Sequence, residues 1–552
     1  MTVLLVTSRR LAGTGQYDRW CAIGDGGPAL DPGREVAGLA KLLEEAYDAV
    51  AETWFRLARA MAEDASAALA HTPTASVNTS DFGLMLAWAR IVETMAAAPE
   101  TVCVICDDPW LFRHLQTLAG VDAQCPPPPI ITVSARLWVR GVMARLKVSI
   151  LVAVAHVRLR RQRGNTAHGG AALLVYGHPG SEPAGRDAYF GPLMSHIPGL
   201  RRVFHVDCPY RRAIRLSGGG SGSLQAWGNL FSALTLFLHR WRPRPELFDL
   251  PEGWLIRRAA AHEGGTGQAA MIRWQRLCQN AWLKETAPSV VAWPWENHAW
   301  ERAFVKTCRA AGTATIGYNH APVYSRERNF STATMIDADR SLPDIIACCG
   351  PSSMAAVRAM GMPGERLVMA GAFRFGAAGT PAFAPRGPVL LALPAAPAIA
   401  RQMIVAAERL AEKGCTVLVK DHPLAPIHFR ETAFMVRTAK AMSEHKELAA
   451  VIYASTSVGL EALIARLPTL RFMPRGIVGQ GLPEGAAGRQ SDVDAKTLAP
   501  VLAAALNEPP PGPLNPDEFF GVVDLELWRR LLTTRPFAVS AGARHPGHRK
   551  RR

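Results

Sequence analysis

The chain has 552 residues, of which 49% are apolar and 20% charged, and its formal net charge is +16. This composition excludes a disordered chain, and the length predicts two or three globular domains. The positive charge raises the question of nucleic acid binding, but no binding motif and no interleaving of basic and aromatic residues is present, so no nucleic acid partner is expected.

The first 130 residues are expected to form an N-terminal α/β region. Apolar runs at residues 2–6 and 101–106 predict buried strands, and a helical pattern extends from about residue 34 to 69. The first run is short and has no cleavage signal after it, and the ten cysteines lack the spacing of a disulfide framework. A cytoplasmic protein with free thiols is therefore expected.

A basic amphipathic segment follows at residues 131–165 and contains the sequence ARLWVRGVMARLKVSILVAVAHVRLRRQR. It has too many charges to span a bilayer, which needs about twenty apolar residues. Two interpretations remain open. Either the helix lies in the interface of an anionic membrane, on the inner face of the cell membrane, or it faces the protein core and leaves its arginines in solvent.

Residues 166–380 are predicted to form a Rossmann-like domain on the acceptor side. Apolar runs followed by polar loops predict parallel strands, and these runs begin near residues 171, 201, 289, 313, 344 and 366. The sequence SGGGSGS at 217–223 has the composition of a mobile loop, and residues 229–241 read as an apolar helix.

The most unusual cluster in this domain is WPWENHAWE, at residues 293–301. Tryptophans surround one carboxylate, so we expect burial to raise the pKa of Glu296 and suit it to remove a proton from an acceptor hydroxyl. His298 and, at the next strand end, His320 are further catalytic candidates. The alternative is a structural N-cap, with Asn297 as the capping residue.

Residues 381–515 are predicted to form the nucleotide-donor domain. An apolar run at 416–419 ends in Lys420-Asp421-His422-Pro423, and another at 451–453 leads to Ser455, Thr456 and Ser457. The three hydroxyls stand where helix caps are wanted, and the helical pattern reaches Leu467. Hydroxyls at a helix start and a histidine at a neighbouring strand end suit a phosphate.

Seven residues are therefore nucleotide-binding candidates. His422 is expected to donate a hydrogen bond or a proton to the departing phosphate, and Glu461 to accept hydrogen bonds from ribose hydroxyls. The full set is Lys420, His422, Pro423, Ser455, Thr456, Ser457 and Glu461. Residues 516–552 are expected to form a crossing helix and a basic disordered tail.

Signals for a metal or another cofactor are weak. Asp337-Ala338-Asp339 and Asp492-Val493-Asp494 match a two-carboxylate pattern for divalent ions, but neither follows a clear strand at a plausible donor site. No glycine-rich phosphate loop with a following lysine occurs. We therefore expect no metal and no cofactor.

The strings KDHP and ASTSVGLEAL resemble the HP and Ser/Thr motifs of bacterial GT-B glycosyltransferases that use cytidine-nucleotide donors, a group with sialyltransferases, Kdo transferases and CDP-glycerol glycerophosphotransferases. WPWENHAWE and GYNHA further resemble a surface-carbohydrate biosynthesis family. The resemblance implies α/β architecture with two Rossmann-like domains facing a cleft, and His422 and the three hydroxyls on the donor phosphate. The acidic pair followed by glycine that supplies the base in those sialyltransferases has no equivalent here.

The function that follows is a metal-independent glycosyltransferase of surface polysaccharide biosynthesis. Its donor would be a nucleotide sugar, with CMP-linked sugars as one expectation, and its acceptor a glycan or a lipid-linked glycan. Two alternatives remain open: transfer of a polyol phosphate by the same fold, and a non-catalytic assembly factor bound to the membrane.

Overall fold

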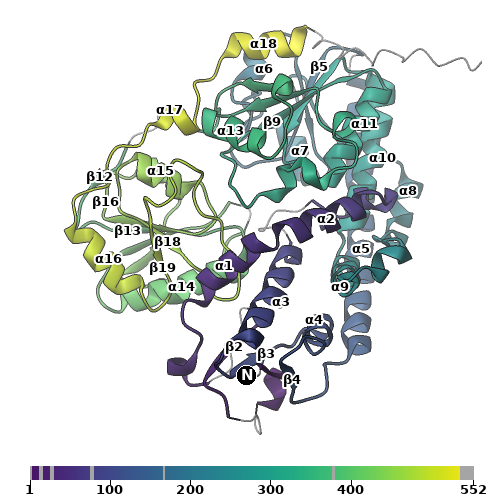
Figure 1. The fold of residues 1–552 in the computed structure, drawn as a ribbon. Coiled ribbons are helices and arrows are strands. Elements are labelled where there is room, and N and C mark those ends of the chain that lie inside the picture. The colour runs from purple at the N-terminus through teal and green to yellow at the C-terminus, as the bar shows by residue number, and fades with distance from the viewer. Residues whose placement is uncertain are drawn as a thin grey trace, which may run out of the picture.

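The computed structural model describes residues 3–11, 16–24, 30–74, 80–165, 168–375, 380–423 and 425–534. Three parallel sheets, each with helices packed against it, make three domains (Figure 1). The expected basic tail beyond residue 534 lies outside the described residues.

The N-terminal domain has a four-stranded sheet. Its order is β2 (Arg19–Ala22), β3 (Val102–Ile105), β1 (Val3–Val6) and β4 (Val121–Ala123). Its helices are α1 (Leu39–Ala49), α2 (Ala51–Ala62), α3 (Phe82–Ala97) and α4 (Pro109–Leu115). The continuous helical pattern expected over 34–69 is thus two helices and a 3₁₀ turn at Ala65–Leu69. Its core also takes Leu255 and Ile256, from a helix far along the chain.

The middle domain has a seven-stranded sheet. Its order is β11 (Leu367–Met369), β10 (Ile345–Cys348), β9 (Ala314–Asn319), β8 (Val290–Pro294), β5 (Ala171–Val175), β6 (Arg201–Phe204) and β7 (Ser221–Ser223). Counted along the chain this is 3-2-1-4-5-6-7 read from the β7 edge, the doubly wound arrangement. The glycine-rich stretch expected to be a mobile loop therefore supplies an edge strand, because Arg202, Val203 and Phe204 pair with it.

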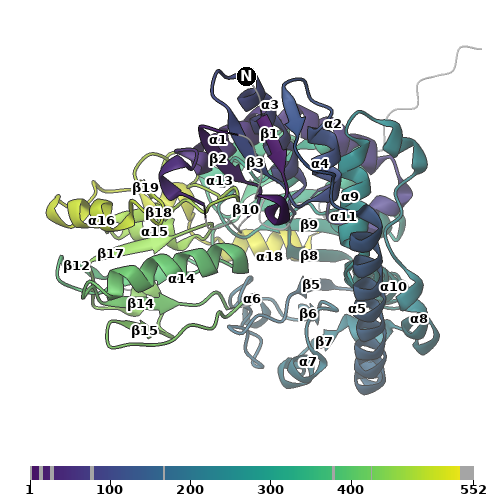
Figure 2. The same ribbon diagram turned by 90° about the horizontal axis from the view of Figure 1, so that it is seen from below.

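Eight helices of the described chain belong to this region. They are α6 (Leu193–His196), α7 (Tyr210–Leu216), α8 (Leu230–Thr235), α9 (Gly253–Gly264), α10 (Gln268–Thr286), α11 (Ala299–Ala310), α12 (Ala338–Ser341) and α13 (Pro351–Ala359). The helix expected over 229–241 is shorter, since α8 gives way to the 3₁₀ turn η6 (Leu236–Leu238). The basic segment forms α5 (Ile130–Leu159), which packs beside α8 and α10 (Figure 2).

The C-terminal domain has a six-stranded sheet in the order 3-2-1-4-5-6. The strands are β15 (Met435–Arg437), β14 (Val417–Lys420), β13 (Val389–Ala392), β17 (Ala450–Tyr453), β18 (Thr469–Phe472) and β19 (Ser491–Val493). Helices α14 (Pro397–Ala411), α15 (Val458–Ile464) and α16 (Leu498–Asn507) cover it, and β12 (Ala382–Phe383) pairs separately with β16 (Glu447–Leu448). Two Rossmann-like sheets are present, so the expected fold class is confirmed.

After this domain the chain returns to the middle domain through α17 (Pro516–Phe519) and α18 (Leu525–Thr533) (Figure 1). Trp528 of α18 is fully buried, and its Nε1 donates a hydrogen bond to the carbonyl of Ala370 at 3.0 Å. The outgoing and returning segments also touch, since the rings of Phe375 and Phe520 stack at 4.1 Å. The C-terminal domain is therefore attached to the middle domain by two crossings that contact each other.

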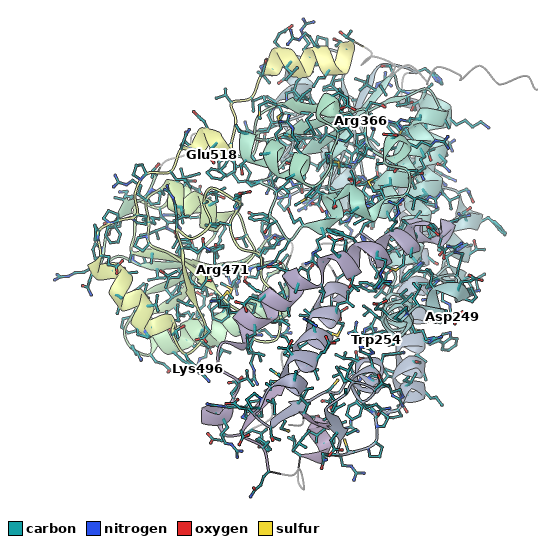
Figure 3. The ribbon with its side chains drawn as sticks, viewed as in Figure 1. Asp249, Trp254, Arg366, Arg471, Lys496 and Glu518 are labelled. Carbon is teal, nitrogen blue, oxygen red and sulfur yellow. The ribbon has the colours of Figure 1, made fainter. Side chains whose placement is uncertain are left out.

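Helix α1 connects all three domains. Glu44 accepts from Arg471 of the C-terminal domain at 3.2 Å and lies 3.0 Å from Arg326 of the middle domain. Arg471 lies beside α1 (Figure 3) and also pairs with Asp492 at 2.7 Å. The N-terminal domain thus braces the other two. Among the described helices, none has the length and apolar character needed to cross a membrane.

Candidate active site

The carboxyl ends of the two doubly wound sheets face each other across a cleft of about 940 Å³. In each sheet this end carries a switch point, β5/β8 in one and β13/β17 in the other, where loops diverge and leave room for a ligand. The N-terminal domain contributes a third wall through Ser80, Asp81 and Leu84. Nine of the ten candidate residues line the cleft, namely Glu296, His320, Lys420, His422, Pro423, Ser455, Thr456, Ser457 and Glu461.

The loop after β8 is held by a buried carboxylate. Glu301 is fully buried and accepts from the indole N–H of Trp293 at 2.9 Å, from the backbone N–H of Glu296 at 3.1 Å and from that of His298 at 2.5 Å. Burial raises the pKa of Glu301 to about 7. The tryptophans in this motif are therefore core residues, and Glu301 fixes the backbone that presents Glu296.

Glu296 is not buried by the tryptophans. Its side chain is 49% exposed toward the cleft, and its Oε2 lies 2.9 Å from Nε2 of His298. The expectation of a raised pKa was wrong. Partial burial opposes ionisation, but the hydrogen bond and charge of His298 outweigh it and lower the pKa of Glu296 to about 2. Glu296 is thus an ionised carboxylate held by a histidine whose own pKa is raised by that contact.

His298 stands behind Glu296 and is itself buried. It is the N-cap of α11, so Asn297, the capping residue of the structural alternative, does not cap the helix. Asn297 adopts a left-handed backbone with φ of 58°, and its amide donates to the carbonyl of Asn329 at 2.8 Å. His71 of the N-terminal domain packs edge-on against His298 at 5.1 Å. The Glu296–His298 pair is thus held by the middle domain and contacted by the N-terminal domain.

The rest of this wall is formed by His320, His178 and Tyr189, which follow β9 and β5. His320 packs edge-on against Tyr189 at 4.9 Å, and its buried Nδ1 has no hydrogen-bond partner among the described atoms. Burial and then the charge of Arg374 lower the pKa of His178 and of His320 to about 4. Both imidazoles are neutral at neutral pH.

Arg374 comes from the crossing segment and lies between the two walls. Its guanidinium lies 5.3 Å from the ring centroid of Tyr189, and its charge helps to lower the pKa of His422 on the opposite wall. No carboxylate of the described residues forms an ion pair with it. A fixed cation at this position gives the cleft a preference for anions.

The opposite wall begins with the turn after β14. The backbone N–H of Ala425 donates to the carbonyl of His422 at 3.0 Å and closes the turn, while Asp421 pairs with Arg437 below it. Nζ of Lys420 donates to the carbonyl of Ala439. Asp421, His422 and Pro423 all line the cleft, and the carboxylate of Asp421 is engaged by Arg437.

The three hydroxyls after β17 have separate environments. Ser455 has a φ of 50° and its Oγ accepts from the backbone N–H of Gln480 at 3.0 Å. Oγ1 of Thr456 is buried without a partner among the described atoms, and Ser457 donates to Glu461 at 3.2 Å. None of them makes the side-chain cap that was expected, and α15 ends at Ile464, before Leu467. The triplet lines the cleft, and Ser457 occupies the N-cap position of α15 without a side-chain cap hydrogen bond.

Arg374 and Glu327 also line the cleft and were not among the candidates. Arg374 belongs to a segment whose sequence gives no indication of function, because its position depends on the returning chain. Glu327 lines the cleft and accepts from the backbone N–H of Tyr324 at 3.0 Å, and burial raises its pKa to about 7. A glutamate with that pKa exchanges protons readily at neutral pH.

The two Asp-x-Asp sequences are engaged elsewhere. Asp337 pairs with Lys306 at 2.5 Å and Asp492 with Arg471 at 2.7 Å. Within the described ranges, no group of three or more His, Cys, Asp or Glu side chains is arranged to hold a metal ion. The cationic side chains of the described residues that line the cleft are Arg374 and Lys420.

No protein-family model matches the chain, and neither does any curated protein sequence. Solved structures with a distant likeness include Arabidopsis thaliana UGT89C1 complexed with quercetin (12% identity, 61% of this chain, 90% of that chain, TM-score 0.37). Others are the S. aureus MnaA–UDP co-structure (10%, 66%, 92%, 0.35) and the lipopolysaccharide outer core galactosyltransferase WaaB in apo form (10%, 61%, 89%, 0.28). Because these TM-scores are low, the fold is assigned from the strand orders of the two sheets and the cleft between them.

Proposed function

We propose that the protein is a glycosyltransferase that moves a sugar from a nucleotide donor to a hydroxyl of a glycan or lipid-linked glycan. One observation carries the proposal. A carboxylate–histidine pair on the middle domain faces a cation and hydroxyl cluster on the C-terminal domain, across a cleft at both switch points. An acceptor beside the pair and a donor phosphate beside the cluster would meet between the domains.

In the proposed reaction, Glu296 accepts the proton of the acceptor hydroxyl while the acceptor oxygen forms a bond to the anomeric carbon, because that bond makes the hydroxyl far more acidic and a carboxylate of low pKa can then take its proton. The bond between that carbon and the phosphate oxygen breaks, and the nucleotide phosphate leaves with the electron pair. His298 holds Glu296 at 2.9 Å and fixes its orientation. His320 lies on the same wall and is a neutral imidazole able to hydrogen-bond the acceptor.

The departing phosphate gains negative charge as the bond breaks. Arg374, Lys420 and His422 supply positive charge or hydrogen-bond donors near it, and the hydroxyls of Ser455, Thr456 and Ser457 supply further donors. Thr456 is the strongest case among the hydroxyls, since its buried Oγ1 lacks a described partner. With the charge met by side chains, the transfer is proposed to need no metal ion.

Glu461 is proposed to bind the ribose of the nucleotide. Burial raises its pKa, and Ser457 donates to it at 3.2 Å, so its carboxylate is fixed on the first turn of α15 at the cleft wall. Pro423 fixes the backbone after His422. The identity of the base, with cytidine as the expectation, is the finer part of the proposal.

The test is nucleotide binding followed by transfer. Purified protein is titrated with CMP, CDP, UDP and GDP by thermal shift and calorimetry, and a bound nucleotide raises the melting temperature because it binds only the folded state. His422→Ala and Ser457→Ala are expected to weaken binding and transfer at least tenfold. Full transfer by both variants, with folding intact, would contradict the proposal.

Donor screening then separates the chemical alternatives. Transfer from CDP-glycerol but from no nucleotide sugar would assign polyol-phosphate transfer to the same cleft. Absence of binding by any of the nucleotides would instead favour a non-catalytic assembly factor. Glu296→Gln is the matched control for catalysis, since it should keep nucleotide affinity and lower the rate by about 10²- to 10⁴-fold.

A further inference from the structure

Helix α5 has two apolar faces, and only one of them is covered. Leu137, Val152 and Leu159 are buried against the middle and N-terminal domains. On the opposite side a stripe of apolar side chains is 40–61% exposed, and it consists of Val139, Met143, Leu146, Ile150 and Val157. Their spacing of three, four and seven residues places them on one line along the helix.

The neighbouring α8 and η6 extend this exposed surface. The exposed fractions are 79% for Phe231, 54% for Leu234 and 61% for Leu238. The buried guanidinium of Arg145 donates from Nε to the carbonyl of Phe237 at 3.0 Å and from Nη1 to that of Gly264 at 2.6 Å. These bonds hold η6 and α9 against α5, and α8 packs along α5 as well, so the exposed apolar side chains of α5, α8 and η6 belong to neighbouring elements. We call them together the docking face.

The docking face is bordered by positive charge. The sequence of α5 contains no aspartate or glutamate, and Arg136, Lys147 and Arg158 on it are exposed. Arg240 and Arg242 follow η6 and are exposed as well. None of these five forms an ion pair with a carboxylate in the part of the chain that the structure describes. A large apolar surface with uncompensated cations at its edge needs an anionic and partly apolar partner.

We propose that the docking face binds the surface of an anionic lipid bilayer. The apolar stripe would enter the boundary between headgroups and acyl chains, and the arginines and lysine would meet lipid phosphates. A second copy of the chain fits less well, because it would bring the unpaired cations of two copies together. In both views α5 and α8 lie on the side of the molecule away from the C-terminal domain (Figures 1 and 2).

The test is co-sedimentation of the full-length protein with phosphatidylcholine vesicles, with and without phosphatidylglycerol. Binding is expected only with the anionic lipid and should weaken as salt is raised. The double variant Phe231→Glu, Leu238→Glu should lower the partition coefficient at least tenfold. Arg136→Gln and Lys147→Gln should each lower it about fivefold, the effect of one basic residue at an anionic surface.

Val522→Glu is the matched control, since Val522 is an 82% exposed apolar residue outside the docking face. It should bind vesicles as the wild type does. Thermal unfolding and nucleotide titration of every variant report folding and the cleft separately, so this test does not depend on the proposed function. Equal binding to neutral vesicles, or full binding by the double variant, would overturn the proposal. Self-association that the double variant abolishes, without vesicle binding, would assign the face to a second copy and overturn it equally.

Discussion

The charge of Arg374 affects the pKa of side chains on both walls of the cleft. It helps to lower the pKa of His178, His320 and His422, which come from three different strand ends. It also opposes the effect of burial on Glu461. Burial first and then this guanidinium thus lower the pKa of all three imidazoles, while Arg374 itself adds a positive charge to the cleft.

Arg374→Gln is expected to lower nucleotide affinity by roughly tenfold to a hundredfold, because a charge-assisted contact to phosphate contributes about 1.5–3 kcal/mol. Calorimetry measures the change. Arg386→Gln is the control, an arginine on the exposed loop before β13 that does not line the cleft. An affinity equal to that of the wild type would remove Arg374 from the phosphate site.

Nucleotide binding should be coupled to proton uptake. The pKa of His178 and of His320 is about 4 in the free protein, and a bound phosphate raises it by stabilising the imidazolium. Between about pH 4 and the higher pKa of the complex, the complex therefore holds more protons than the free protein, so affinity rises as pH falls within that window.

Calorimetry in buffers of different ionisation enthalpy measures this uptake at about pH 6. His178→Asn and His320→Asn should each reduce the number of protons taken up. Because the wild type and the variants bind the same nucleotide, protons taken up by its phosphate cancel in the comparison. An unchanged uptake in both variants would place the titrating group elsewhere.

At this scale the sequence predicted where the side chains would gather but not their electrostatic state. The strand-end positions of Glu296, His422 and Ser455 were readable from apolar runs followed by polar residues. The pKa of Glu296 was not, because it depends on His298 two residues later and on the loop that Glu301 fixes. Arg374 was missed because its neighbours in space are distant in sequence.

At the scale of elements, α15 shows how tightly the hydroxyl triplet is placed. Gly459 lies on the first turn of α15 against the ring of Tyr453, and a Cβ built at Gly459 would lie 2.5 Å from that ring. The close approach brings the helix, with Ser457 and Glu461, down onto the strand before it.

Gly459→Ala should therefore destabilise the protein by about 1–3 kcal/mol through overpacking, although alanine favours helix more than glycine does. It should also weaken nucleotide binding, since α15 must move. Chemical denaturation and calorimetry measure the two effects. In Gly264→Ala, at the end of α9, the new Cβ meets no atom within 4 Å, so this variant should be neutral or slightly stabilising. Equal stability of the two variants would contradict the packing argument.

The elements themselves were predicted best where periodicity was strong. The strands at 417–420 and 450–453 closely follow the apolar runs at 416–419 and 451–453. Edge strand β7 was missed because three glycines precede it, and a glycine-rich run is compatible with both loop and edge strand. Helices α9 and α10 were not assigned from the sequence.

At the scale of the whole molecule, Glu44 ties three domains through two arginines. Glu44→Gln should lower the free energy of unfolding by about 2 kcal/mol, because Arg471 is 8% exposed and loses one of its two carboxylate partners. Denaturant unfolding measures the loss. Glu45→Gln is the matched control on the same helix, since its pair with Lys41 spans 4.0 Å between exposed side chains and should contribute little. A loss no larger than that of the control would show that the brace does not stabilise the assembly.

The two crossings between the middle and C-terminal domains limit how the cleft can move. Phe375 and Phe520 stack where the chain leaves the middle domain and where it returns to it. Both covalent connections of the C-terminal domain therefore lie at one of its edges. We expect any rotation of the C-terminal domain to take place about that edge, and such a rotation would widen or narrow the distance between Glu296 and His422 without disturbing either sheet. The hydrogen bonds between Glu44 and Arg471 form a separate contact with the same domain. Loss of the Glu44 contacts is therefore expected to change how often the cleft opens, while the stacked crossings at Phe375 and Phe520 stay in place.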